Sequence, residues 1–205
     1  MSNRAGSTLV AMLLTSVLPV AGADWLFSAE IIKAPTTDRF SVCFDHSCRT
    51  IVTRSFNPGE WQRITGPLQS PAPTALAERA AIANTIALME QNVGEKTGTA
   101  GDRGGNFAGF GQQGQMDCID ESSNTTTYLK LLQQAGLLRF HKVMDRSTRF
   151  GLFAGMPHTT AVIRDLASGQ DYAVDSWFFD NGELPVIMQL DAWKSGWRPD
   201  DKDHE

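Results

Sequence analysis

The sequence predicts an α+β fold in which a helix packs against an antiparallel sheet. A helix is expected over 118–135, because apolar residues such as Leu129 and Leu132 recur at helical spacing and Gly136 provides a C-cap. Three segments rich in β-branched and aromatic residues follow, separated by turn-forming residues: 138–144, 158–164 and 172–179. Because short turns join these strands, we expect them to pair antiparallel beside the helix.

The first half of the chain predicts a hairpin and two helices. Segments 39–44 and 48–56 are rich in β-branched and aromatic residues, and the polar residues between them form the turn. Asn57 is expected to cap a short helix, because proline and glutamate follow at the first and third helical positions. After a proline-rich connector, Thr74 is expected to cap a longer helix that ends at Gly94.

The segment 94–114 is dense in glycine and is expected to be a loop leading to the next helix. Its residues 109–114, Gly-Phe-Gly-Gln-Gln-Gly, formally match a dinucleotide-binding fingerprint. The context differs, because no apolar strand precedes the motif and no acidic residue follows at the required distance. A nucleotide cofactor is therefore not expected. Near the end of the chain, Asp191 is expected to cap a final short helix.

The composition is that of an ordinary globular domain. Hydrophobic residues make up 41% and charged residues 20% of the 205-residue chain, which is long enough to bury one core. The formal net charge is −5. Because binding to nucleic acid needs a basic face, nucleic acid is not expected to be a partner.

The first 23 residues have the pattern of a secretory signal peptide. Arg4 gives a positive start, 8–18 is nearly all apolar, and Ala21-Gly22-Ala23 fits the small-residue cleavage rule. We therefore expect a periplasmic or secreted protein with no membrane span after cleavage. The expected regions are the signal peptide 1–23, a hairpin and helical region 24–94, a catalytic core 95–197 and a charged tail 198–205.

The three cysteines suggest one disulfide and one free thiol. Cys43 and Cys48 are close in the sequence, so the simplest assignment pairs them and leaves Cys118 free. A zinc site formed by Cys43, His46 and Cys48 is the alternative, but it lacks a fourth ligand and a usual spacing.

The residues Cys118, His158 and Asp175 together suggest nucleophilic catalysis. Cys118 begins a predicted helix, where unpaired N–H groups and the helix dipole favour a thiolate. His158 begins a predicted strand, and Asp175 interrupts the apolar strand beside it. A lone buried cysteine is usually inert, but a nucleophile, a base and an orienting acid in this arrangement are the members of a triad.

A family resemblance supports this interpretation. Three stretches, 116–121 (Met-Asp-Cys-Ile-Asp-Glu), 158–163 (His-Thr-Thr-Ala-Val-Ile) and 172–177 (Tyr-Ala-Val-Asp-Ser-Trp), together resemble bacterial transglutaminase-like cysteine proteinases of the periplasmic LapG type. The resemblance covers about 110–180 and implies a papain-like core. It also implies that Cys118 attacks an amide carbonyl, that the histidine moves the proton and that the aspartate orients the histidine. Gln112 is the preferred side-chain donor of the oxyanion hole.

Three acidic residues lie beside the nucleophile: Asp117, Asp120 and Glu121. Their negative charge opposes formation of a thiolate, although they also suit the N-terminus of a helix. Since LapG-type enzymes depend on calcium, the resemblance implies that these carboxylates hold that ion. The polar residues that follow include a glycosylation sequon at Asn124, which we attribute to chance.

The sequence thus predicts an exported thiol hydrolase that cleaves a peptide or amide bond in a protein or peptide substrate. No cofactor is required for this chemistry, although calcium is possible. Two alternatives remain open. The same triad suits a transglutaminase or acyltransferase, and the same fold suits a catalytically silent binding module.

Overall fold

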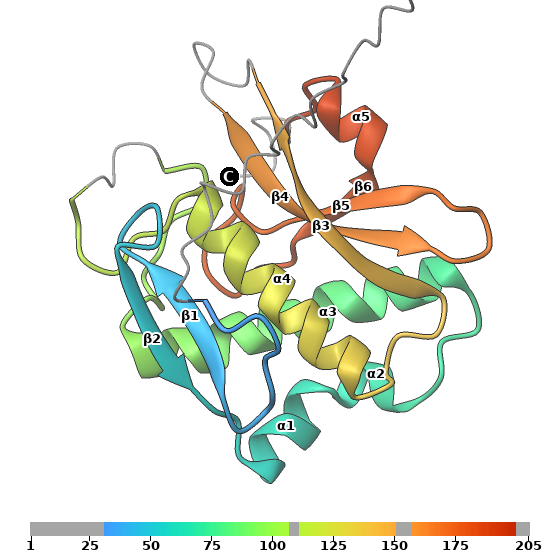
Figure 1. Cartoon of the computed structure of the whole chain (residues 1–205), viewed down its shortest axis with the longest axis horizontal. Coiled ribbons are helices and arrows are strands. Elements are labelled where there is room, and N and C mark those ends of the chain that lie inside the picture. The colour runs from blue at the N-terminus through green and yellow to red at the C-terminus, as the bar shows by residue number, and fades with distance from the viewer. Residues whose placement is uncertain (1–30, 107–110, 151–156, 200–205) are drawn as a thin grey trace, which may run out of the picture.

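A central helix lies between a hairpin and a second, larger sheet, as Figure 1 shows in the computed structural model. The model describes residues 31–106, 111–150 and 157–199. The mixture of helices with antiparallel sheets confirms the predicted α+β class. The predicted signal peptide 1–23 and most of the predicted charged tail 198–205 lie outside the described residues.

The predicted hairpin is confirmed. Strands β1 (Phe40–Phe44) and β2 (Thr50–Arg54) pair antiparallel, with Phe44 opposite Thr50. Five residues, 45–49, join them, and the first four all have positive φ, between +54° and +67°, although none of them is glycine. Left-handed backbone costs an L-residue roughly 1–2 kcal/mol, so other interactions must hold residues 45–48, which we call the left-handed turn.

Three helices follow the hairpin: α1 (Pro58–Ile64), α2 (Gly66–Gln69) and α3 (Ala75–Thr97). The predicted caps of α1 and α3 are confirmed, because the side chains of Asn57 and Thr74 accept N–H bonds from the first turns of these helices. The cap predicted at Asp191 is wrong, because the last helix begins at Leu190 and its N-cap is Gln189.

Two details of these helices correct the prediction. The proline-rich connector contains the short helix α2, and α3 does not end at Gly94 but continues to Gly98, whose φ of +80° closes the helix. Gly94 is instead a position where neighbouring groups approach the helix backbone closely. A Cβ atom there would lie 2.8 Å from the Asn181 side chain and 3.1 Å from the backbone of Ala100.

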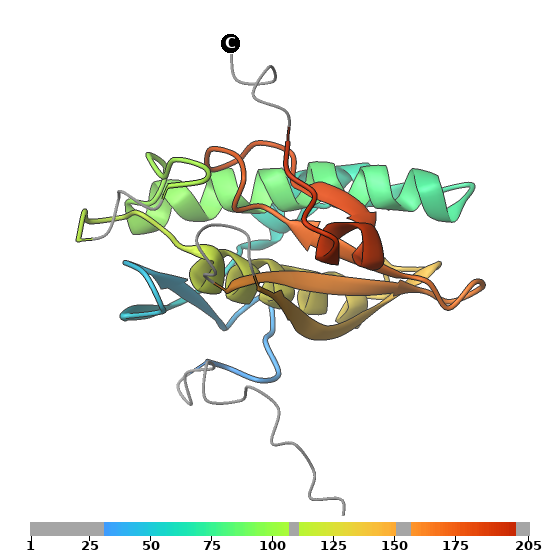
Figure 2. The ribbon, with the colours of Figure 1, turned by 90° about the horizontal axis from the view of Figure 1, so that it is seen from above.

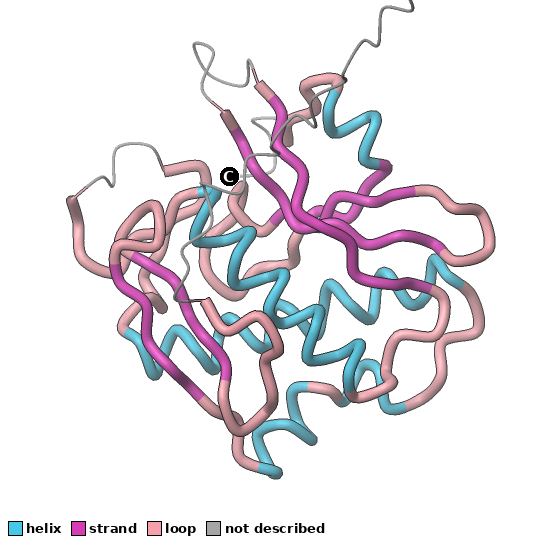
Figure 3. Tube along the Cα trace, viewed as in Figure 1, coloured by secondary structure: helices cyan, strands magenta, loops and turns pink. Residues whose placement is uncertain are grey.

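The predicted central helix is α4 (Cys118–Gln134), and a four-stranded antiparallel sheet follows it in the order β3-β4-β5-β6. Its strands are β3 (His141–Arg149), β4 (His158–Asp165), β5 (Asp171–Asp175) and β6 (Val186–Gln189), and α5 (Leu190–Lys194) ends the fold. Figure 2 shows α3 running along one side of the molecule, and Figure 3 shows the loop segments between α3 and α4.

Strand β4 is buried on both faces. Its residues Ala161 and Ile163 join the core made with α3 and α4, whereas Val162 packs with Leu190 and Trp193 of α5 on the other face. Strand β4 therefore carries a continuous apolar run rather than an alternating pattern. This arrangement places the start of β4 near the start of α4 (Figure 1).

The predicted strands differ from the observed ones at their ends. Strand β3 begins later than predicted and continues to Arg149 through a bulge between Met144 and Ser147, where polar residues had suggested a loop. Strand β5 ends at Asp175, and β6 was not predicted. Pairing with neighbouring strands decides these boundaries, and pairing leaves little trace in local composition. In the three described ranges, no helix is long and apolar enough to cross a membrane.

A buried acid–histidine pair fixes the start of β3 to α3. The Glu78 carboxylate accepts bonds from the backbone N–H groups of Arg139 and Phe140, and one oxygen lies 2.8 Å from His141 Nδ1. The Arg79 guanidinium donates to His141 Nε2 at 3.2 Å.

We expect Glu78→Ala to lower the free energy of unfolding by about 1–3 kcal/mol, because it leaves the buried His141 Nδ1 and the partly buried N–H groups of Arg139 and Phe140 without an acceptor. Urea denaturation of the purified protein measures this change. Glu95→Ala, an exposed position on the same helix, is the matched control and should change stability little. Equal stability of the two variants would contradict the assigned role of Glu78.

Candidate active site

Cys118 is the first residue of α4 and the free cysteine of the described chain. Its thiol is 9% exposed and packs with Trp177 and Phe178. The pKa of the Cys118 thiol is raised to about 12, mainly by burial and also by the nearby charges of Asp117 and Asp175, although the backbone N–H groups of Thr159 and of Cys118 itself favour the thiolate. The expectation that the helix N-terminus lowers this pKa is therefore wrong, because desolvation outweighs the helix.

His158 and Asp175 form the predicted base–acid pair. His158 begins β4, Asp175 ends β5, and His158 Nε2 lies 2.7 Å from Asp175 Oδ2. His158 Nδ1 is buried and has no hydrogen-bond partner within the described ranges. Cys118 Sγ lies 3.9 Å from the carbonyl oxygen of Pro157, the residue before His158. The imidazole is thus bonded to an acid at Nε2 and has no hydrogen-bond partner in the described ranges at Nδ1.

Aromatic side chains enclose the imidazole. Its ring centroid lies 4.7 Å from Trp177, 5.2 Å from Phe178 and 5.3 Å from Trp193. These rings fix the orientation of His158 and exclude water from its bond to Asp175, which strengthens the electrostatic interaction between them.

Trp193 also orients the acid directly. Its indole N–H donates to Asp175 Oδ2 at 2.7 Å, and the backbone N–H of Trp177 donates to Oδ1 at 3.2 Å. Arg149, which pairs across the sheet with His158, donates to the Trp193 carbonyl and stacks 4.1 Å from the centre of its ring. This role of Trp193 was not predicted, because the sequence shows only an aromatic residue in a short helix.

The predicted oxyanion donor Gln112 lies toward the hairpin. It is exposed and lines a shallow pocket that also contains Asp45, Arg49 and Thr50. The buried glutamine of this segment is Gln115, whose side chain accepts from Asn106 and donates to the carbonyl of Gly101. No contact tests the assignment of Gln112, which stays a prediction.

The hairpin is bonded to the first turn of α4. Asp117 caps the helix by accepting from the N–H groups of Ile119 and Asp120, and its other oxygen accepts from the N–H and hydroxyl of Ser47. Asp120 accepts from the N–H groups of His46 at 2.8 Å and Cys48 at 2.6 Å. The sequence shows the helix cap but not its partner 70 residues away.

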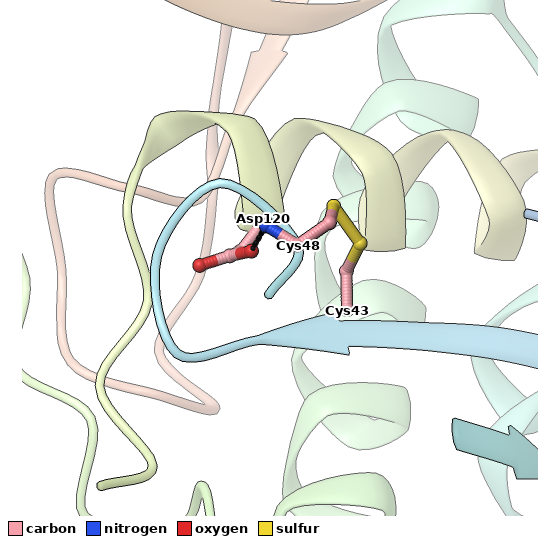
Figure 4. Close-up of side chains that lie close together, drawn as sticks. All are labelled: Cys43, Cys48 and Asp120. Atoms are coloured by element: carbon pink, nitrogen blue, oxygen red, sulfur yellow. Dashed lines mark hydrogen bonds between the residues drawn. A yellow bond between two sulfur atoms is a disulfide. The ribbon is translucent and has the colours of Figure 1, made fainter. Parts of the chain in front are cut away.

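The predicted disulfide between Cys43 and Cys48 is confirmed and closes the left-handed turn. Figure 4 shows it beside Asp120, which bonds to the backbone of Cys48. Both sulfurs of the alternative zinc site are therefore in a disulfide, which removes the thiolates that zinc requires.

The three carboxylates predicted to hold calcium do not converge. The oxygens of Asp117 and Asp120 already accept N–H bonds, and the fully buried Glu121 has Glu90 and Asp102 as neighbours in addition to Asp120. Because calcium needs several free oxygens around one point, these residues as they lie do not fit the ion. We derive no catalytic step from it.

Glu121 belongs to a buried carboxyl cluster with Glu90 and Asp102, each at most 5% exposed. Burial raises the pKa of Glu90 and Asp102 to about 7, and burial together with the neighbouring acids raises the pKa of Glu121 well above its usual value. At least one of these carboxyls is therefore protonated at neutral pH. This cluster could not be predicted from local patterns, since its members come from separate segments.

The polar residues inside α4 are structural. The Asn124 side chain makes two 2.8 Å hydrogen bonds to the backbone of Cys43, so this buried sequon is a packing feature. Thr127 donates to the carbonyl of Ser123, and Thr125 lies 3.2 Å from the hydroxyl of Ser176.

Comparison with family models, curated proteins and solved structures gives no match to this chain.

Proposed function

We propose that this protein is a thiol hydrolase that cleaves a peptide or amide bond, with Cys118 as nucleophile, His158 as base and Asp175 as orienting acid. The observation that carries the proposal is the buried imidazole of His158. Its Nε2 lies 2.7 Å from Asp175 Oδ2, whereas its Nδ1 has no hydrogen-bond partner in the described ranges. A structural histidine is normally bonded at both nitrogens when it is buried.

The proposed reaction begins from a neutral thiol, because burial disfavours the thiolate. The Cys118 sulfur attacks the carbonyl carbon as His158 Nδ1 accepts the thiol proton. The backbone N–H of Cys118, at the first turn of α4, donates to the oxyanion. The C–N bond then breaks, and the leaving amine takes the proton from His158. Water next attacks the thioester carbonyl as His158 accepts its proton, the C–S bond breaks, and the proton returns to the Cys118 sulfur as the acid leaves.

The proposal also includes the type of catalytic core and the compartment in which the protein acts. The order of the triad on a helix and two neighbouring strands supports a papain-like, transglutaminase-like core. A disulfide forms in oxidising compartments, and Cys43–Cys48 therefore supports export to the periplasm or the medium. Calcium dependence stays a prediction. Measuring turnover with added calcium and with a chelator tests it.

Labelling of the thiol tests the proposal without a known substrate. We expect iodoacetamide at pH 7 to alkylate Cys118 about tenfold or more faster in the wild type than in His158→Ala, because the base removes the thiol proton. Mass spectrometry of the Cys118 peptide measures the rate. Leu166→Ala, at an exposed position just after β4, is the control and should retain His158-dependent labelling.

A peptide library then separates the chemistries. Hydrolysis by the wild type and none by Cys118→Ala supports the proposal. Incorporation of an added amine without hydrolysis would assign the site to acyl transfer instead. Equal labelling of the wild type and His158→Ala, together with no turnover, would reject catalysis by this triad.

A further inference from the structure

The left-handed turn has a conformation that its own residues disfavour. Four consecutive residues, 45–48, have positive φ, and none of them is glycine. Left-handed backbone brings the Cβ atom against the carbonyl group, so a free peptide with the sequence of residues 43–48 would adopt other conformations. The disulfide encloses this segment, since it links Cys43 within β1 to Cys48, the last residue of the turn.

This conformation directs the backbone of the turn at the helix that carries the nucleophile. Three successive N–H groups, those of His46, Ser47 and Cys48, all donate to carboxylates of α4. The acceptors are Asp117 and Asp120, which lie on either side of Cys118 in the sequence. An extended segment would turn successive N–H groups in opposite directions and lose this convergence.

The same bonds control charge beside the thiol. Asp117 is one of the charges that raise the pKa of Cys118, and the N–H and hydroxyl of Ser47 partly neutralise it. Loss of the turn would expose the full charge of Asp117 and free the first turn of α4. Both changes oppose transfer of the Cys118 proton to His158.

We infer that the Cys43–Cys48 disulfide is a redox switch for Cys118: the oxidised pair holds the left-handed turn that anchors the first turn of α4, and reduction releases it. This inference rests on the proposed function of Cys118. A dithiol reductant transfers two electrons to the switch. The S–S bond breaks, each sulfur takes one proton, and the dithiol becomes a cyclic disulfide.

The test compares the oxidised protein with protein reduced by dithiothreitol and desalted without oxygen. The measured quantity is the ratio of the iodoacetamide labelling rates of Cys118 in the wild type and in His158→Ala, because this ratio cancels changes in accessibility. We expect a ratio of about ten or more in the oxidised protein and close to one after reduction. Oxidised glutathione should restore the ratio, and Cys43→Ser with Cys48→Ser should give a low ratio that does not respond to dithiothreitol.

Amide hydrogen exchange locates the change. Reduction should speed exchange in the peptides that contain the left-handed turn and the first turn of α4, and leave β4 protected. A high ratio in both redox states, with the disulfide shown to be open, would overturn the switch. Faster exchange throughout the chain would also overturn it, since the disulfide would then support the whole fold. A ratio near one in the oxidised protein would instead reject the proposed base–nucleophile pair.

Discussion

Asp175→Ala should lower turnover of a peptide substrate by about 10³–10⁴-fold, because the acid that orients the histidine is removed. It should also destabilise the fold. The donors at His158 Nε2 and Trp193 Nε1 both lie 2.7 Å from Asp175 Oδ2, and each buried donor left unpaired costs about 1–3 kcal/mol. Steady-state kinetics and urea denaturation measure the two effects.

Two variants separate orientation of the histidine from general damage. Asp171→Ala lies on the same strand and removes an ion pair with Arg164, so its turnover should stay close to that of the wild type. Trp193→Phe keeps most of the ring against His158 but deletes the N–H that Asp175 accepts. Its kcat should fall while KM changes little. Turnover of Asp175→Ala within threefold of the wild type, by contrast with the large loss expected for a triad acid, would contradict its role.

The stability of the protein should fall as pH rises from about 4 to about 7. The carboxyl cluster holds protons in the folded state that the unfolded chain releases, because burial raises the pKa of Glu90 from 4.5 and of Asp102 from 3.8, both to about 7. The stabilising contribution is complete below the unfolded pKa and is lost as pH reaches the folded pKa. For Glu90 alone, this change corresponds to roughly 3 kcal/mol.

Glu90→Gln removes one of these titrations. Urea denaturation of this variant between pH 5 and pH 8 should show a shallower loss of stability than the wild type. Glu95→Gln changes an exposed residue of the same helix and should leave the wild-type slope unchanged. If the stability of the wild type rose over this range, the buried acids would not be protonated in the folded state.

The helices and the order of the strands could be predicted because they rest on local patterns. Asn57 and Thr74 cap their helices as expected. The end of α3 was predicted wrongly at Gly94, because glycine is required both at left-handed helix caps and where other groups approach the backbone closely. Gly94 meets the second requirement, since Asn181 and Ala100 lie close to it, whereas the left-handed cap is Gly98. Strand β6 carries no strong alternation, and its pairing with β5 decides its conformation.

The candidate site was predictable only in its chemistry-bearing residues. His158 and Asp175 lie at the ends of neighbouring strands, so a prediction of pairing was enough to bring them together. The environment was not predictable, since the burial of Cys118 depends on Trp177 and Phe178 in the folded chain. For the same reason the sequence indicated a lowered thiol pKa, whereas burial raises it.

The bonds of Asp117 to Ser47 and of Trp193 to Asp175 also set the order in which the site can assemble. Ser47 lies 70 residues before Asp117, and Trp193 lies 18 residues after Asp175. Contacts between distant residues form late, because long loops must close first. A chain that is still emerging from the ribosome therefore has a thiol but no oriented base. Under the proposed function, the site would therefore be complete only when nearly the whole domain has folded.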